Sequence, residues 1–243
     1  MNEYNVDAYN YLLKYSQSII RIGEHIYSIK DVNSRYIDCS EPFLKFIQKK
    51  KKGIIGKYDY DLPWGEYASL YREIDRRTLD EHNIISIVPV IDCSCKISHS
   101  LAKKTTIKDN NGNIIGLLKH SKVLKDTNDI VSINFLKAFD AALFGLKINK
   151  HFYFIKNSYE PLNLSQQESS LLFYYARGLS YQKISCIYPK IDEKNIKCAL
   201  NNIKHKLEIN SISEIITLLI ETKQFNVIPS GINIGHIFNL FNS

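Results

Sequence analysis

The stretch from Leu164 to Leu207, LSQQESSLLFYYARGLSYQKISCIYPKIDEKNIKCALNNIKHKL, decides the fold of the C-terminal part of the chain. Ser165 followed by Glu168 predicts a helix start, because each side chain can bind the backbone N–H of the other residue. Gly178 predicts the end of that helix, since glycine adopts the left-handed conformation without steric cost. Ser180 then predicts the N-terminus of a short second helix.

A third helix is expected to begin at Asp192-Glu193, after a turn that contains Pro189. Acidic side chains are favourable at a helix N-terminus, and proline ends the helix before it. Apolar residues then recur at spacings of four, three and four, which is typical of one buried helix face. These residues are Ile196, Leu200, Ile203 and Leu207.

The opposite face of the third helix carries mainly lysines and amides. Its residues are Lys194, Asn195, Lys197, Cys198, Asn201, Asn202, Lys204 and His205. Lysines bind phosphates and side-chain amides can read base edges, so this face fits the major groove of double-stranded DNA. A polar face with lysines is also typical of a helix that is merely solvated, and the pattern alone leaves both interpretations open.

The order of residues in this segment resembles the LuxR-type helix-turn-helix family. The matching residues are Leu164, Ser165, Glu168, Leu172, Ala176, Gly178, Ser180, Ile184, Lys197, Ile203, Lys206, Leu207 and Ile209. The resemblance implies base reading by Lys197, Cys198 and Asn201. It implies phosphate contacts by Lys194, Asn195, Lys204 and Lys206, and Ser180 and Asn202 complete the DNA-binding residues that we expect.

Four features depart from the family pattern. The turn at Pro189 is one residue longer, Ala199 replaces a usual His, Gln182 replaces a usual Lys, and Glu208 replaces a usual Gly. The missing cations predict a weaker grip on phosphates. A degenerate module that binds protein instead of DNA therefore stays open. The resemblance also places a dimerisation helix at Ser211–Glu221.

The N-terminal half shows a mixed pattern of helices and strands. Apolar residues at spacings of three and four predict an amphipathic helix over residues 6–20. Short apolar runs predict a hairpin, a later strand at Ile84–Ile91, and two more strands that meet at the turn Asp109–Asn113. Helices are expected at Phe43–Ile47 and Tyr67–Glu81 between them. The predicted class is α+β, with one antiparallel sheet followed by an all-helical module.

Residues 26–122 resemble a PAS domain. The resemblance rests on Tyr27–Asp31, Arg35–Ile37, Phe43, Ile54–Asp59, Tyr71–Asp75, and the hairpin from Ile107 to Gly116. It implies a sensing role, and a GAF-like sensor fold is the alternative. The input is a small molecule or a partner that the sequence does not identify.

Aromatic side chains in this half are candidates for an apolar ligand pocket. They are Tyr36, Phe43, Phe46, Trp64, Tyr67 and Tyr71. The same residues fit an ordinary core equally well. An acyl-lactone-binding quorum-sensing regulator is a further alternative, although its expected Trp, Tyr and Asp set cannot be assembled. His82 is a minor candidate for a haem ligand, and Cys93, Cys95 and His99 are minor candidates for a metal site, so no cofactor is expected.

Five parts follow from these patterns: a helix at 1–20, a PAS-like sensor at 21–126, a signalling helix and linker at 127–160, the helix-turn-helix at 161–223, and an apolar, uncharged tail at 224–243. Within the linker, residues 132–147 carry a heptad-like stripe. That stripe suits either a dimer-forming signalling helix or a helix packed on its own domain. The tail is expected to pack on the body or on a second subunit.

The composition sets the cellular context that we expect. A net charge of +7 suits an anionic partner, here double-stranded DNA. Five irregularly spaced cysteines argue against disulfides and for a reducing compartment. The N-terminus lacks a secretory signal pattern, and no phosphate-binding loop, nucleophile elbow or metalloprotease motif occurs. We therefore expect a cytoplasmic, homodimeric transcription regulator without membrane contact or enzymatic activity.

Overall fold

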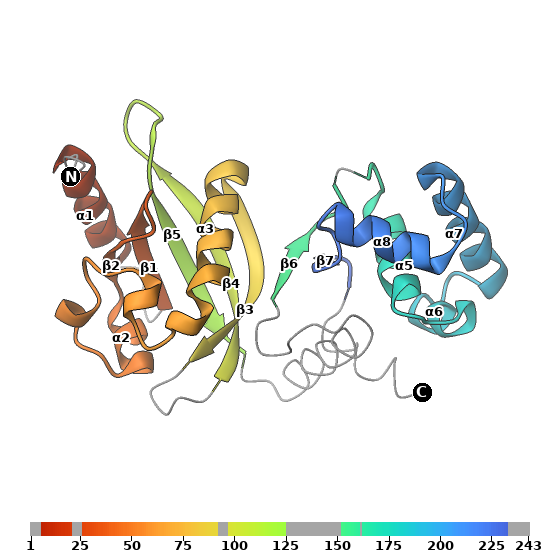
Figure 1. Cartoon of the computed structure of the whole chain (residues 1–243), viewed down its shortest axis with the longest axis horizontal. Helices are drawn as coiled ribbons and strands as arrows, with labels where there is room; N and C mark the ends of the chain where they lie inside the picture. The colour runs from red at the N-terminus through yellow and green to blue at the C-terminus, as the bar shows by residue number, and fades with distance from the viewer. Residues whose placement is uncertain (1–5, 21–25, 92–96, 125–151, 161, 233–243) are drawn as a thin grey trace. The chain divides into compact units, whose positions relative to one another are not determined.

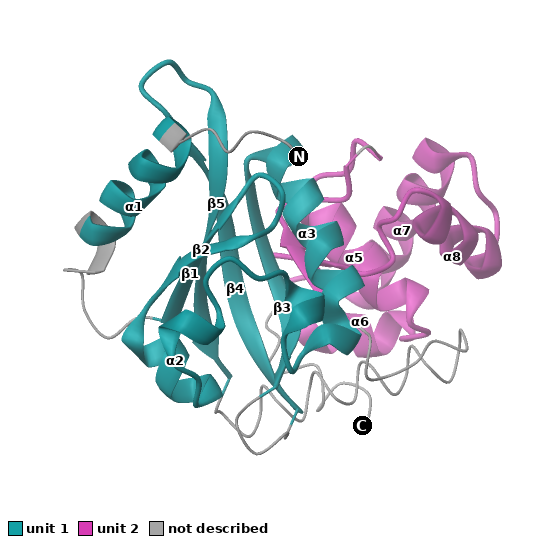
Figure 2. Ribbon diagram, turned by 60° about the vertical axis from the view of Figure 1, so that its left-hand side comes forward, with its two compact units in different colours: residues 1–124 teal, residues 125–243 magenta. Residues whose placement is uncertain are grey.

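The computed structural model describes residues 6–20, 26–91, 97–124, 152–160 and 162–232. The chain forms two compact units, residues 1–124 and 125–243 (Figure 2). The stripe expected at 132–147, the candidate metal ligands Cys93 and Cys95, and the tail beyond residue 232 lie outside the described residues.

The first unit is built on a five-stranded antiparallel sheet (Figure 1). Its strands are β1 (Ile26–Asp31), β2 (Tyr36–Cys39), β3 (Asn83–Ile91), β4 (Ile97–Lys108) and β5 (Ile114–Val123), in the order β2-β1-β5-β4-β3. The turn between β4 and β5 forms as expected, because the Asp109 carboxylate accepts the backbone N–H groups of Asn111 and Asn113, and Gly112 has a φ of 84°. The predicted α+β class with an antiparallel sheet is confirmed, and this strand order is PAS-like.

Three α-helices cover the sheet: α1 (Val6–Ile20), α2 (Glu41–Ile47) and α3 (Ala68–Glu81). Short 3-10 turns at Lys51–Gly53, Asp59–Asp61 and Gly65–Tyr67 connect α2 to α3. Successive side chains of a strand point to opposite faces of a sheet. Ile29 packs in the cluster around Leu12 of α1, whereas the next residue, Lys30, bonds Asp75 of α3. The helices α1 and α3 therefore cover opposite faces.

Gly116 lets α1 approach the sheet closely. A Cβ added at this residue would lie 2.6 Å from the backbone oxygen of Lys30 and 2.8 Å from Cδ2 of Leu12. Leu12 is only 1% exposed and occupies this space. The docking of α1 thus depends on the missing side chain of a strand residue.

The second unit contains the expected helices α5 (Gln166–Ala176), α6 (Tyr181–Ile187), α7 (Glu193–Leu207) and α8 (Ile212–Glu221). The capping box of Ser165 and Glu168 is present, and the side chains of Ser180, Asp192 and Ser211 cap the next three helices. Gly178 has a φ of 81°, as its position after α5 predicted. None of the helices in the described residues combines the length and apolar character that crossing a membrane requires.

Two short strands that we had not predicted frame these helices. β6 (Tyr153–Lys156) falls in the expected linker and β7 (Val227–Pro229) in the expected tail, and they pair in parallel. The apolar residues of the tail are buried as far as they are described, with Phe225 and Val227 at 5% and 0% exposure. The apolar tail therefore packs on its own unit up to residue 232.

Arg177 fixes the segment after α8 to α5. It is 1% exposed, and its guanidinium donates to the backbone oxygens of Phe173, at 3.3 Å, and Phe225, at 3.0 Å. The same group stacks between the two phenyl rings, with centroids 3.9 and 4.9 Å away. The segment that leads into β7 is therefore bound directly to the helical core.

Candidate DNA-binding surface and ligand cavity

The helix α7 has one buried and one exposed face. Ile196, Leu200 and Ile203 are at most 1% exposed, whereas Leu207 is half-buried. The buried stripe predicted from the spacing is therefore confirmed for its first three residues. Because this stripe is buried, the residues on the opposite side of α7 face outward.

Six predicted DNA-binding residues share the exposed face of α7: Lys194, Asn195, Lys197, Cys198, Asn201 and Asn202. Within the described residues, no hydrogen bond or ion pair engages any of their side chains. Cations and amides that bond nothing within their own unit remain available for an external partner. We call this set of six residues the α7 face.

The other three predicted residues have internal partners. Lys204 is half-buried, and its ammonium donates to the Tyr175 hydroxyl at 3.1 Å and lies 5.0 Å from that ring's centroid. Lys206 forms an ion pair of 3.3 Å with Glu168. The Ser180 hydroxyl accepts the backbone N–H of Lys183 as the cap of α6. These residues lie outside the α7 face.

Two stacked tyrosine rings join α5 to α6 next to Lys204 of α7. The rings of Tyr175 on α5 and Tyr181 on α6 stack with centroids 5.7 Å apart and planes inclined by 7°. Lys204 on α7 bonds the first of them. Three helices therefore meet at one contact, which holds α7 at a fixed angle to the other two.

A partly open cavity lies between the sheet of the first unit and the helices α2 and α3. Five of the six predicted pocket residues line it: Tyr36, Phe43, Phe46, Trp64 and Tyr71. Tyr67 does not line it but packs against Tyr71, with ring centroids 6.4 Å apart. Charged residues that we had not predicted complete the wall: Lys30, Asp59, Lys104 and Lys119.

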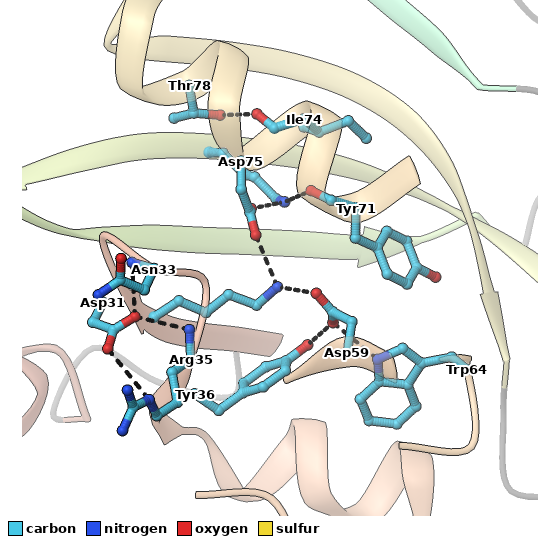
Figure 3. Close-up of polar contacts among 12 residues, drawn as sticks. Asp31, Asn33, Arg35, Tyr36, Asp59, Trp64, Tyr71, Ile74, Asp75 and Thr78 are labelled. Carbon is cyan, nitrogen blue, oxygen red and sulfur yellow. Dashed lines mark hydrogen bonds and ion pairs between the residues drawn. The ribbon is translucent and has the colours of Figure 1, made fainter. Parts of the chain in front are cut away.

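Asp59 is the centre of a buried hydrogen-bond network at this cavity (Figure 3). Its Oδ1 accepts from the Tyr36 hydroxyl at 2.8 Å and from the Trp64 indole N–H at 3.0 Å. Its Oδ2 pairs with the Lys30 ammonium at 2.5 Å. These bonds fix two of the cavity's aromatic side chains, and burial together with Asp59 raises the pKa of the Tyr36 hydroxyl.

Asp75 of α3 pairs with two lysines of the sheet. Its Oδ2 accepts from Lys30 at 3.0 Å, and its Oδ1 accepts from Lys104. Burial alone raises the pKa of the Asp75 carboxyl, but the two ammonium groups outweigh burial and hold that pKa well below its usual range. A sequence signal existed, because Asp75 lies four residues after buried Tyr71 and three before buried Thr78, on the same helix face.

Lys119 of β5 differs from the other two lysines. In the described part of the chain it donates no hydrogen bond and pairs with no carboxylate, and its ammonium lies 5.7 Å from the Tyr71 ring centroid. Burial, together with the neighbouring ammonium groups of Lys104 and Lys30, lowers the pKa of Lys119 to about 7. The cavity wall thus contains one cation without a counter-ion.

Of the minor cofactor candidates, His82 and His99 lie within the described residues. His82 ends α3 in the left-handed conformation, is exposed, and is absent from the cavity wall. His99 is buried on β4. Among the described residues, no group of three or more His, Cys, Asp and Glu side chains is placed to hold a metal ion.

Comparison with known proteins found no matching family model and no matching curated protein. Among solved structures, the phage VqmA–DPO complex is 18% identical, with 93% of this chain and 94% of that chain covered and a TM-score of 0.45. The Vibrio cholerae VqmA dimer, described as one of the LuxR-type receptors, is 18% identical, with 90% of this chain and 91% of that chain covered and a TM-score of 0.45. The PAS domain of Bordetella pertussis BvgS is 14% identical, with 55% of this chain and 98% of that chain covered and a TM-score of 0.41. The strand order of the first unit is PAS-like, and four helices, α5 to α8, form most of the described part of the second unit.

Proposed function

We propose that this chain is a sequence-specific DNA-binding transcription regulator that senses a small molecule through its PAS-like unit. The α7 face carries this proposal. It presents Lys197 and Asn201 on one exposed helix surface, and neither side chain has a partner within the described residues. Exposed lysines supply phosphate contacts and amides supply base contacts in the major groove.

The proposed role of the regulator requires two copies on a two-fold symmetric site. On α8, Ile212 and Ile220 are 38% and 50% exposed, and half-buried Ile216 lies between them at a spacing of four. An apolar stripe of this kind fits a second copy of the same helix. We therefore propose that α8 forms the dimer contact.

Selection of binding sites from random DNA with the full chain tests the proposal. Fluorescence anisotropy then compares the selected duplex with a scrambled duplex across a range of salt concentrations. We expect a preference for the selected site and an affinity that falls steeply with salt, because bound lysines release counter-ions. Equal affinity for the two duplexes would reject sequence-specific binding.

A double variant assigns the binding surface. Lys197→Ala with Asn201→Ala removes one charge and one amide from the α7 face, and we expect the preference for the selected site to disappear. The matched control is Lys122→Ala with Asn210→Ala, which removes the same groups from two exposed positions elsewhere. If both double variants bind the selected site like the native chain, α7 is not the reading helix. Capture of a protein with no retention of DNA would favour the degenerate module, and thermal stabilisation by acyl lactones would favour the quorum-sensing alternative.

A further inference from the structure

We propose that the cavity of the PAS-like unit binds a small carboxylic acid with a short apolar body, and that Lys119 pairs with its carboxylate. The inference rests on the sensing role proposed above and adds the chemical class of the ligand. Three lysines and two aspartates meet at this cavity, so the site carries one positive charge in excess whenever Lys119 is protonated. An anionic ligand would neutralise this excess positive charge.

Every oxygen of the two aspartates already accepts a hydrogen bond from a residue other than Lys119. Asp59 accepts three bonds, from Tyr36, Trp64 and Lys30. Asp75 uses one oxygen for Lys30 and the other for Lys104. Among the described residues, Lys119 is therefore the lysine of this cluster that forms no ion pair with either aspartate.

A cation is costly to bury unless it is paired. Lys119 is half-buried on the cavity wall and forms no ion pair with a carboxylate among the described residues. Lys122, three residues later on the same strand, is exposed and hydrated instead. A bound carboxylate 2.7–2.9 Å from the Lys119 ammonium, the usual length of such a charge-assisted bond, would satisfy the cation.

The rest of the wall sets the size and polarity of the ligand. Phe43, Phe46, Ile47 and Val90 line the cavity with apolar surface. Its free volume is about 40 Å³, which is room for roughly three water molecules. A short aliphatic body attached to the carboxylate fits these limits, whereas a large cofactor does not.

Trp64 gives a direct measurement, because it is the only tryptophan of the chain and lines the cavity. The full chain is titrated at pH 6.5 and constant ionic strength with acetate, propionate and isobutyrate, and in parallel with the three corresponding amides, while Trp64 fluorescence is recorded. We expect saturable changes with at least one acid, and an affinity at least tenfold higher than that of its amide. Amides that bind as tightly as the acids, or acids that give no saturable change, would overturn the proposal.

Two variants test whether Lys119 is the residue that binds the carboxylate of the ligand. Lys119→Met retains an unbranched apolar side chain, one atom shorter than that of lysine, and removes its charge. Lys122→Met is the matched control at an exposed position of the same strand. We expect at least a tenfold loss of acid affinity in the first variant, no change in the second, and unchanged amide affinity in both. Because the acid–amide comparison uses the native chain, it decides the question even if Lys119→Met fails to fold.

The DNA experiment described above is run without any acid, so the two hypotheses fail separately. Acid binding without a preference for selected DNA would remove the regulatory role and leave the ligand class in place. A preference for selected DNA with no discrimination between acid and amide would remove the ligand class alone.

Discussion

The ammonium of Lys204 donates a hydrogen bond to the hydroxyl of Tyr175 at 3.1 Å, so a lysine expected to contact phosphate also joins α7 to α5. Lys197, on the same helix, has no such partner in the described residues. The two lysines therefore differ in what their removal should change.

We predict that alanine at position 204 lowers stability, whereas alanine at position 197 weakens DNA binding. Lys204→Ala should lower the free energy of unfolding by about 0.5–1.5 kcal/mol, the usual contribution of one hydrogen bond. Lys197→Ala should stay within about 0.5 kcal/mol of the native chain and weaken binding to the selected DNA. Urea unfolding and anisotropy on the same samples check both. Equal losses of stability in the two variants would contradict the contact with Tyr175.

Removing the Asp75 carboxylate should destabilise the first unit. Asp75→Asn leaves the buried ammonium groups of Lys30 and Lys104 without one of their counter-ions, and such a loss costs about 3–5 kcal/mol. Asp80→Asn, at an exposed position of the same helix, is the control and should have little effect. Urea unfolding at pH 7, followed by Trp64 fluorescence, measures the difference.

The same carboxyl predicts how acid affects stability. Because its pKa is depressed in the folded state, it stabilises the fold above the unfolded value of about 4, and this contribution is lost as pH falls toward the folded pKa. The urea midpoint of the native chain should therefore drop between pH 4 and pH 2. In Asp75→Asn this drop should be smaller, and an identical drop in both proteins would count against the prediction.

The lowered pKa of the Lys119 ammonium also makes the stability of the fold depend on pH, but here a buried cation destabilises the folded state. Its folded pKa of about 7 lies below the unfolded value of about 10.4, so the unfolded chain binds more protons between these values and stability rises with pH across that range. Lys119→Met removes the penalty of the buried charge. We expect it to stabilise the chain at pH 6, by about 1–3 kcal/mol, and by less at pH 9. A gain that is the same at both pH values would refute this account.

A side chain at Gly116 should displace α1. In Gly116→Ala the new Cβ meets the backbone oxygen of Lys30 and the side chain of Leu12, and we expect a loss of about 1–3 kcal/mol, as for other overpacked sites. Gly53→Ala is the control, since its Cβ would contact nothing within 4 Å. Limited proteolysis should cut near α1 sooner in Gly116→Ala only.

Arg177→Leu should loosen the second unit without affecting the first. It removes two hydrogen bonds to backbone oxygens and a guanidinium stacked between two phenyl rings, which together contribute about 2–4 kcal/mol. Circular dichroism should show earlier unfolding, while Trp64 fluorescence, which reports on the first unit, keeps its midpoint. Arg76→Leu, at an exposed position, is the control. A shifted Trp64 midpoint would mean that the two units unfold together.

The elements with strong local signals were predicted within one or two residues. Ser165, Gly178 and Asp192 mark helix ends through their own backbone and side-chain chemistry, so the sequence carries them directly. The strands β6 and β7 carry no such signal. Each is at most four residues long, and their pairing joins segments about 70 positions apart, as in Phe154 and Val227.

We predicted the aromatic residues of the cavity wall from the sequence, except that Tyr67 lies outside it, but we did not predict its charged residues. Lysines in strands are usually solvated, so nothing local distinguishes buried Lys104 from its exposed neighbour Lys103. The register of β4 on β5 decides it, because Lys104 lies opposite Lys119 in the sheet. Only the assembled sheet brings these two ammonium groups to the same wall.

The parallel pairing of β6 and β7 also has a mechanical consequence. β6 begins at Tyr153 and β7 ends at Pro229, and the two strands run in the same direction. Tension applied to these two residues pulls the strands past each other in shear, which loads their hydrogen bonds together instead of opening them one by one. A force applied at Tyr153 and Pro229 is therefore opposed by all of these bonds at once.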